Sequence, residues 1–297
     1  SVDGKLTINP RTVTLTSETA SKEYDGTPLT KPVVTVTGDG FVTGEVSDIK
    51  ATGSATFVDD GEVSNAITFT TGEKFNEDNY TITKNEGKLS ITKRTDIIVI
   101  TTPTRSRAYN GRKLLDYSCT YTGTIADGDE LIMTFPEDDG LINAGSKPNQ
   151  YKSYRVERKS DGRNVTNNYT FGESIIGTLT VTPVAIELTA ASASKAYDGT
   201  PLTNSNYTIT KGAFVGEEGL ATVTIAGSQT LVGASANTIT GHTLKDNTLA
   251  QNYTITYQPG ELKVVETIPY SDGARAAVKC YGANDVLEGV AIMKHEK

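Results

Sequence analysis

The sequence predicts an all-β protein, a tandem array of about three small antiparallel β-sandwich domains of Ig-like size that form an extended rod. Three observations carry this prediction: short segments alternate apolar and polar residues, Asp-Gly and Asn-Gly turn signals are dense, and a ten-residue motif recurs along the chain. A β-grasp-like repeat is the alternative. It would need an amphipathic helix, and the sequence contains no convincing one.

The alternating segments read as half-buried strands. In Arg11–Glu18, Val13 and Leu15 fall on one face while threonines occupy the other. The segments that begin at Tyr80 and Gly87 follow the same pattern. A period of two residues places one face of a strand toward a core and the other toward water.

Three landmarks recur in the same order, about 85 residues apart, which is typical of a tandem repeat. The first reads SKEYDGTPLT, SRAYNGRKLL and SKAYDGTPLT; the second is Asn-Tyr-Thr, and the third is a glycine followed by an alternating strand. The motif residues, to which we assign structural roles, are Tyr24, Asp25, Gly26, Tyr109, Asn110, Gly111, Tyr197, Asp198 and Gly199, with Tyr80, Tyr169 and Tyr253 of the second landmark.

These landmarks divide the chain. The predicted segments are a closing strand of a preceding repeat (1–10), repeat 1 (11–94), repeat 2 (95–183), repeat 3 (184–266), and a truncated further repeat or an unrelated tail (267–297). The junctions between repeats contain no Gly/Ser-rich or Pro-rich spacer. Short junctions favour a semi-rigid array.

Within the first landmark, the tyrosine is expected to be a buried aromatic residue beside an obligatory turn. Asp-Gly and Asn-Gly suit such turns because both residues tolerate positive φ. Repeat 2 replaces the aspartate by Asn110 and keeps the tyrosine and the glycine. This pattern indicates packing and turn formation, since a catalytic carboxylate would not tolerate asparagine.

Composition argues against several classes of function. The net charge of −8 and the pI near 5.0 disfavour binding to nucleic acid or to an anionic membrane surface. No apolar stretch is long enough for a transmembrane helix. Cys119 and Cys280 are interpreted as incidental thiols.

Catalytic and metal chemistry are not expected, and neither is a cofactor. Neither histidine, His242 or His295, has a recognisable nucleophile arrangement around it. The acidic segments 127–130 and 137–140 lack EF-hand spacing and are interpreted as solvated loops. We therefore predict a protein that is not an enzyme.

The repeated YDGTPLT, NYTIT and G-x-L-x-I-T segments resemble the YDG/MBG-type repeats of bacterial cell-surface proteins, over residues 11–266. Repeat 2 departs from the motif at Asn110, Arg112 and Lys113. The resemblance implies an extracellular, adhesin-like protein of the bacterial surface or cell wall. Its repeats would form a non-catalytic stalk that presents a distal region.

The alternative function is a binding module that recognises a host glycan or an extracellular-matrix protein through repeat 2. A locally basic, aromatic stretch supports it, with Tyr151, Lys152, Tyr154, Arg155 and Arg158 as the candidate patch. An edge strand protected by Lys and Arg explains the same residues. The chain is expected to be largely monomeric, with weak association through unpaired strand edges.

Overall fold

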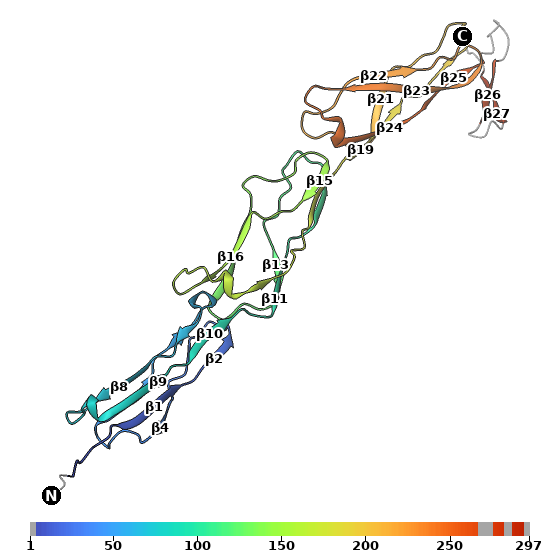
Figure 1. The fold of residues 1–297 in the computed structure, drawn as a ribbon. Coiled ribbons are helices and arrows are strands. Elements are labelled where there is room, and N and C mark those ends of the chain that lie inside the picture. Colours follow the sequence, from blue (N-terminus) through green and yellow to red (C-terminus); the bar gives the residue numbers. More distant parts are fainter. Residues whose placement is uncertain (1–3, 267–275, 282–286, 294–297) are drawn as a thin grey trace. The chain divides into compact units, whose positions relative to one another are not determined.

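The structure is a computed structural model that describes residues 4–266, 276–281 and 287–293 (Figure 1). The prediction of an all-β protein made of small Ig-like β-sandwiches is confirmed: among these residues the helical segments are all short 3₁₀ turns. These turns, each of three residues, are η1 (Val58–Asp60), η2 (Glu77–Asn79), η3 (Thr166–Asn168) and η4 (Ala250–Asn252). No helix in the described part of the chain is long and apolar enough to cross a membrane.

The chain forms two compact units, and both contain parts of repeat 2. The first comprises the residues up to Arg105, with Leu115–Asp139 and Pro148–Thr178. The second comprises Ser106–Leu114, Gly140–Lys147 and the residues from Leu179 onward. Structural compactness therefore does not follow the sequence repeats one for one.

Repeat 1 contains two three-stranded sheets, each built around one central strand, and two further strand pairs. The sheets are β4 (Val34–Gly38), β1 (Arg11–Ser17) and β9 (Tyr80–Asn85), and then β2 (Ala20–Glu23), β10 (Lys88–Thr92) and β7 (Val63–Ser64). The pairs are β3 (Leu29–Thr30) with β6 (Ser54–Ala55) and β5 (Val46–Ala51) with β8 (Ile67–Thr71).

Repeats 2 and 3 also contain two main sheets each, with different additional strands. Repeat 2 contains β13 (Thr120–Thr122), β11 (Ile97–Thr101) and β17 (Thr170–Phe171), then β12 (Arg105–Ala108), β18 (Thr178–Thr182) and β15 (Gly145–Pro148), and the pair β14 (Asp129–Thr134) and β16 (Ser153–Arg158). Repeat 3 contains β21 (Tyr207–Lys211), β19 (Val184–Ala190) and β24 (Tyr253–Gln258), then β20 (Ala193–Ala196), β25 (Gly260–Val265), β23 (Gly233–Leu244) and β22 (Leu220–Ala226).

Beyond repeat 3, β26 (Ala276–Tyr281) pairs antiparallel with β27 (Leu287–Met293). The two interpretations of 267–297, a further repeat or a tail, fall on a segment that is mostly outside the described residues. Both interpretations stay predictions.

The strand pairing departs from purely antiparallel sheets in one consistent way. In each repeat the first strand pairs in parallel with the strand that precedes the closing strand: β1 with β9, β11 with β17 and β19 with β24. After each of these paired strands the chain crosses to the second sheet. The strands that follow them therefore also pair in parallel, β2 with β10 and β20 with β25. Period-2 alternation reports burial and not direction, so it could not reveal this.

The crossing point explains the glycine of the third landmark. A Cβ atom on Gly87 would lie 2.3 Å from the carbonyl oxygen of Glu18, and one on Gly177 would lie 2.3 Å from Pro103. On Gly260 it would lie 2.5 Å from the carbonyl oxygen of Ala190. Two backbones bend past each other here, and only glycine fits between them.

The buried cores do not stop at the repeat boundaries. One cluster joins Tyr24, Leu89 and Ile91 of repeat 1 to Ile98 and Tyr169 of repeat 2. A second joins residues of repeats 2 and 3, and a third, with Val13, Leu15, Ile67 and Tyr80, lies within repeat 1. Consecutive repeats therefore share a core.

Candidate functional site

Two sites with the same chemistry lie where consecutive repeats meet. Each contains the motif tyrosine of one repeat, and a carboxylate and the Asn-Tyr-Thr tyrosine of the next. We call Tyr24, Asp129 and Tyr169 joint 1, and Tyr109, Glu218 and Tyr253 joint 2. Joint 1 lies in the first compact unit and joint 2 in the second.

In joint 1, one carboxylate oxygen receives both phenols. The hydroxyls of Tyr24 and Tyr169 donate to Oδ2 of Asp129 at 2.8 and 2.6 Å. The Tyr169 hydroxyl also accepts the backbone N–H of Ala126 at 3.1 Å. The two rings meet edge to face, with centroids 5.6 Å apart. Asp129 is only 6% exposed, so this polar cluster is buried.

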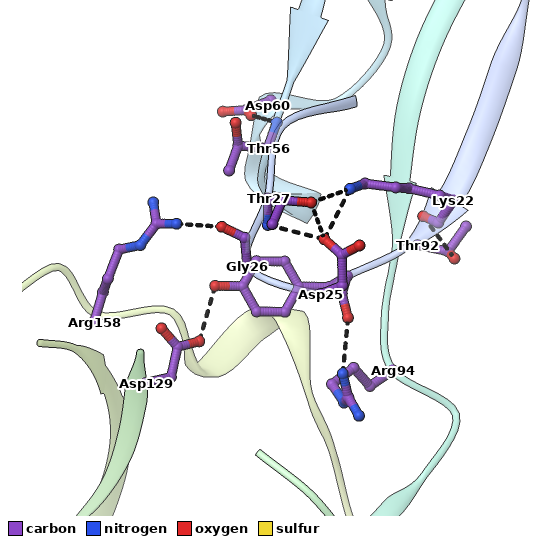
Figure 2. A network of polar contacts seen from close by, with 11 residues as sticks. Lys22, Asp25, Gly26, Thr27, Thr56, Asp60, Thr92, Arg94, Asp129 and Arg158 are labelled. Carbon is purple, nitrogen blue, oxygen red and sulfur yellow. Dashed lines mark hydrogen bonds and ion pairs between the residues drawn. The ribbon is translucent and has the colours of Figure 1, made fainter. Parts of the chain in front are cut away.

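Further contacts bind the same two repeats together (Figure 2). Arg158 of repeat 2 donates to the carbonyl of Gly26. Arg94, the last residue of repeat 1, donates to Oγ1 of Thr124 in repeat 2 at 2.7 Å and to the carbonyl of Tyr24 at 3.1 Å. The backbone N–H of Val58 donates to Oδ1 of Asn168 at 2.7 Å. Arg163 lies over the ring of Phe57, 3.8 Å from its centroid, a cation–π arrangement.

Joint 2 distributes its phenols over both carboxylate oxygens. Tyr109 donates to Oε1 of Glu218 and Tyr253 donates to Oε2, each at 2.6 Å. The Tyr253 hydroxyl accepts the N–H of Val215 at 2.9 Å. The ring centroids of the two tyrosines are 5.7 Å apart, again edge to face. As in joint 1, the Asn-Tyr-Thr asparagine takes part: Oδ1 of Asn252 accepts the N–H of Ala144 at 2.8 Å.

The four joint tyrosines resist ionisation. Burial, followed by the hydrogen bond to Asp129, raises the pKa of Tyr24 and Tyr169. Burial and Glu218 raise the pKa of Tyr253 in the same order, whereas for Tyr109 the hydrogen bond to Glu218 is the larger cause. A phenol that stays protonated keeps donating, so these clusters act as fixed hydrogen-bond donors around an anionic acceptor.

The turn beside each motif tyrosine is stabilised locally. Lys22 and Thr27 converge on Oδ1 of Asp25, with Lys22 Nζ at 2.8 Å (Figure 2). The hydrogen bond from Lys22 is the main cause that lowers the pKa of Asp25 to about 2. Lys195, Asp198 and Thr200 repeat this arrangement in repeat 3. The motif glycines Gly26, Gly111 and Gly199 all adopt positive φ, as their turns require.

The predicted motif residues thus separate into groups. Tyr24, Tyr109, Tyr169 and Tyr253 come together in two joints, and Tyr80 is buried against Glu45 in repeat 1. In repeat 2, Asn110 Oδ1 accepts the N–H of Arg112 at 3.1 Å, so the turn forms without a carboxylate. Tyr197 differs from the other motif tyrosines, with 45% of its surface exposed.

The candidate binding patch of repeat 2 does not form one exposed surface. Arg158 belongs to joint 1, while Tyr151 and Tyr154 are half-buried and pack edge to face on each other. Lys152 and Arg155 are exposed, and Arg155 forms an ion pair with Glu157 at 2.7 Å. Two of the five residues remain as candidates for an exposed contact.

The joint carboxylates were missed by the sequence analysis. Glu45, Asp129 and Glu218 each follow their repeat's motif tyrosine by about twenty residues, within FVTGE, IADGD and FVGEE. This is a fourth landmark. Asp129 lies in the acidic segment 127–130, interpreted as a solvated loop, and that interpretation is wrong for Asp129 because its carboxylate is buried.

No described residues provide a metal centre, since no group of three or more His, Cys, Asp or Glu side chains among them gathers closely enough. His242 contacts the hydroxyl of Tyr257 through Nδ1. Cys119 is a half-buried free thiol, and burial raises its pKa. The side chain of Cys280 and all of His295 lie outside the described residues.

A family model described as GGGtGRT protein matches residues 213–297. The resemblance to YDG/MBG-type repeats is therefore wrong: the family that matches is a different one, and no adhesin family is found. The motifs behind that resemblance are turn and packing residues, which any repeat with these joints would need. No curated protein matches the chain.

Two solved structures show limited similarity, both of the four N-terminal Ig domains of Dscam1. Isoform 9.44 is 10% identical, with a TM-score of 0.17 and coverage of 85% of this chain and 72% of the other. Isoform 4.44 is 9% identical, with a TM-score of 0.16 and coverage of 86% and 75%. Similarity at this level carries no argument about function.

Proposed function

We propose that this chain is a non-catalytic structural segment, a stalk in which consecutive β-repeats are fixed to one another by buried tyrosine–carboxylate joints. The observation that supports it is the paired burial of two tyrosines, one from each of two consecutive repeats, on a single carboxylate. Rotating one repeat against the next would expose or unpair these groups, and leaving a buried polar group unpaired costs about 1–3 kcal/mol. Joints of this kind suit a structural segment whose repeats must not rotate against one another.

The proposal includes an extracellular location on a bacterial surface, where the segment would present a distal region. The tandem organisation supports a spacing role, and the acidic composition is unfavourable for a nucleic-acid partner. The family resemblance that first suggested this location no longer contributes.

Small-angle X-ray scattering of the chain tests the stalk. Three consecutive sandwiches are expected to give a maximum dimension of roughly 100 Å or more, from strands of ordinary length. Asp129→Ala should broaden the distance distribution, because one joint loses its acceptor. Glu62→Gln is the matched control, since it removes only an exposed ion pair with Lys88. A compact particle, or equal distributions for Asp129→Ala and the control, would contradict the proposal.

Recognition of a host glycan or matrix protein through repeat 2 is the second candidate, and the exposed side chains of Lys152 and Arg155 are what favour it. The test is a binding scan over mucin glycans and matrix proteins with a Lys152→Ala/Arg155→Ala variant beside the wild type. Arg158 is left unchanged because its loss would disturb joint 1. Binding by the wild type that the variant loses would support recognition.

A further inference from the structure

Repeat 1 carries, at its N-terminal end, a joint with one tyrosine instead of two. The Tyr80 hydroxyl donates to Oε2 of Glu45 at 2.6 Å and accepts the N–H of Val42 at 3.0 Å. This reproduces the roles of Tyr169, Asp129 and Ala126 in joint 1. The missing position is that of the motif tyrosine from a preceding repeat.

The residues around this position are exposed where their counterparts are buried. Asn79 is exposed, whereas the equivalent Asn168 and Asn252 are 2% and 0% exposed. Leu6 and Ile8 are 92% and 88% exposed. The corresponding apolar residues of the three closing strands are all almost fully buried: Leu89, Ile91, Leu179, Val181, Leu262 and Val264. Exposed apolar side chains at positions that are buried in the other repeats indicate an interaction surface.

A cavity of about 430 Å³ lies beside these residues, and Asn9, Arg11, Glu45, Asn79 and Tyr80 line it together. Its volume is within the range of about 300–1,000 Å³ that is typical of small-molecule pockets. Carboxylate, guanidinium and amide groups line the same space. The cavity therefore offers room for an aromatic ring and polar groups that can hydrogen-bond to it.

Arg11 identifies which kind of group fits. It follows the segment GKLTINP as Arg94 follows GKLSITK, so the two arginines take the same place after a closing-strand sequence, although Arg11 already belongs to β1 and Arg94 lies before β11. Arg94 donates to the carbonyl of the docked Tyr24 at 3.1 Å and to Thr124 at 2.7 Å. Arg11 already donates to the carbonyl of Gly40 at 2.9 Å, in the loop that corresponds to that of Thr124.

We propose that this face is a docking site for the tyrosine of a Tyr-Asp-Gly or Tyr-Asn-Gly turn, carried by a further β-repeat that precedes Arg11 in the same polypeptide. The phenol of that turn donates to Glu45, its tyrosine carbonyl accepts from Arg11, and a backbone N–H of that repeat donates to Asn79. Gly4–Pro10 complete the closing strand of that repeat, which buries Leu6 and Ile8. The inference rests on joint geometry and goes beyond the proposed stalk function.

The test is an extended chain in which a second copy of residues 11–86 stands directly before Gly4, so that Gly4–Pro10 take the place of its closing strand. Amide hydrogen exchange is measured over residues 41–45 and 77–80 of the original repeat. Docking of the added tyrosine should slow exchange there by about tenfold or more, the size expected for a new hydrogen bond to a charged group. Exchange in joint 2 is the internal reference.

Two matched variants assign the effect. Tyr24→Phe in the added copy keeps the ring and removes the hydroxyl, and it should abolish most of the protection. Glu62→Gln in the added copy should leave it unchanged. A folded added repeat with unchanged exchange at 41–45 and 77–80 would overturn the inference, whatever the scattering experiment shows for the stalk.

A second extended chain, with a copy of residues 184–259 before Gly4, covers the case in which the first added copy does not fold. Repeat 3 supplies its own motif tyrosine and normally closes at Gly260, the counterpart of Gly4. Folding of each copy is followed through the protected amides of its own first strand. If neither copy folds onto Gly4–Pro10, those residues do not act as a closing strand, and the inference fails.

Discussion

The two joints use the same three groups and differ in how the carboxylate presents its oxygens. Asp129 in joint 1 accepts both phenols on Oδ2, and its Oδ1 finds no hydrogen-bond partner among the described residues. Glu218 in joint 2, with a side chain longer by one methylene, gives each phenol its own oxygen. The shorter acid is the more buried one and the less completely hydrogen-bonded one.

Joint 1 adds contacts that compensate for this difference. Arg158 and Arg94 reach backbone carbonyls of the motif turn, and Arg163 lies over Phe57. A buried carboxylate is costly unless it is hydrogen-bonded or near positive charge. Joint 1 therefore adds arginine contacts to the motif turn and to Phe57, whereas in joint 2 the carboxylate gives each phenol its own oxygen.

Removing each carboxylate gives the largest expected effect. Asp129→Ala should lower the free energy of unfolding of the first compact unit by about 3–5 kcal/mol, because two hydrogen bonds to a charged acceptor are lost in a closed site. Glu218→Ala should cost the second unit roughly half as much, since Glu218 is only half-buried and water can reach the two phenols. Denaturant unfolding followed by region-resolved hydrogen exchange measures both values.

The control for this pair is Glu62→Gln, an exposed ion-pair variant expected to stay within about 0.5 kcal/mol of the wild type. Equal losses for the two carboxylate variants would contradict the contrast between the joints. Loss confined to one repeat, with its neighbour unaffected, would contradict the shared core.

Alkaline pH should lower the free energy of unfolding through both joints, and this is the second largest of the expected effects. The pKa of each joint tyrosine is raised above the ordinary value near 10, so the unfolded chain releases phenolic protons first as pH rises. The stabilisation is therefore present below pH 10 and is lost above it, by about 1.4 kcal/mol per tyrosine per pH unit. Ultraviolet titration should show these tyrosines ionising only with unfolding, and early ionisation of Tyr24 would count against a closed joint 1.

Much of this arrangement was predictable from sequence. The alternation of Val13 and Leu15 and the turn at Gly26 follow from local patterns, because strand periodicity and positive φ are properties of a few adjacent residues. The expected burial of the motif tyrosine holds for Tyr24 and Tyr109 but not for Tyr197. The parallel pairing of β1 with β9 was not predictable, since it depends on both strands crossing between sheets at one place.

The joint carboxylates were not predicted from the sequence, for a related reason. Asp129 stands in a stretch of sequence typical of a solvated loop, and it is buried where Tyr24 of the preceding repeat and Tyr169 of its own repeat meet on its carboxylate. A pattern inside one repeat cannot report a partner from another. Comparison of all three repeats at the positions of Glu45, Asp129 and Glu218 would have given the signal.

Alanine at the turn glycines separates backbone strain from crowding at the joints. Gly26, Gly111 and Gly199 share positive φ, so alanine costs each about 1 kcal/mol. A Cβ at Gly111 would also lie 3.2 Å from Val215, and one at Gly26 would lie 3.4 Å from the carbonyl oxygen of Asp127, whereas none of the described atoms is within 4 Å at Gly199. We expect an excess of about 0.5–1 kcal/mol at Gly111 and less at Gly26, measured by thermal unfolding. An equal cost at all three would show that the joints tolerate the extra methyl group.

Acid should destabilise the turn beside Tyr24 but not the turn beside Tyr109, and this is the smallest of the expected effects. The Lys22 hydrogen bond lowers the pKa of Asp25 to about 2, from an ordinary value near 3.8. The stabilisation is therefore present above pH 3.8 and is lost as pH falls toward 2. Because the carboxylate is largely exposed, we expect a few tenths of a kcal/mol. The turn beside Tyr109 carries Asn110 at this position, so that turn has no carboxylate to titrate.

Exchange of the Thr27 and Arg112 amides between pH 5 and pH 2 measures this contrast, after correction for the intrinsic pH dependence of exchange. These amides donate to Asp25 and Asn110 respectively, so each reports its own turn. Asp25→Asn should make the two turns alike in acid by removing the titrating group. Asn110→Asp should introduce acid sensitivity into joint 2, because Arg107 occupies the position of Lys22. If Thr27 loses protection in acid even with Asn at position 25, the acid sensitivity does not arise at Asp25, and the predicted contrast between the two turns is wrong.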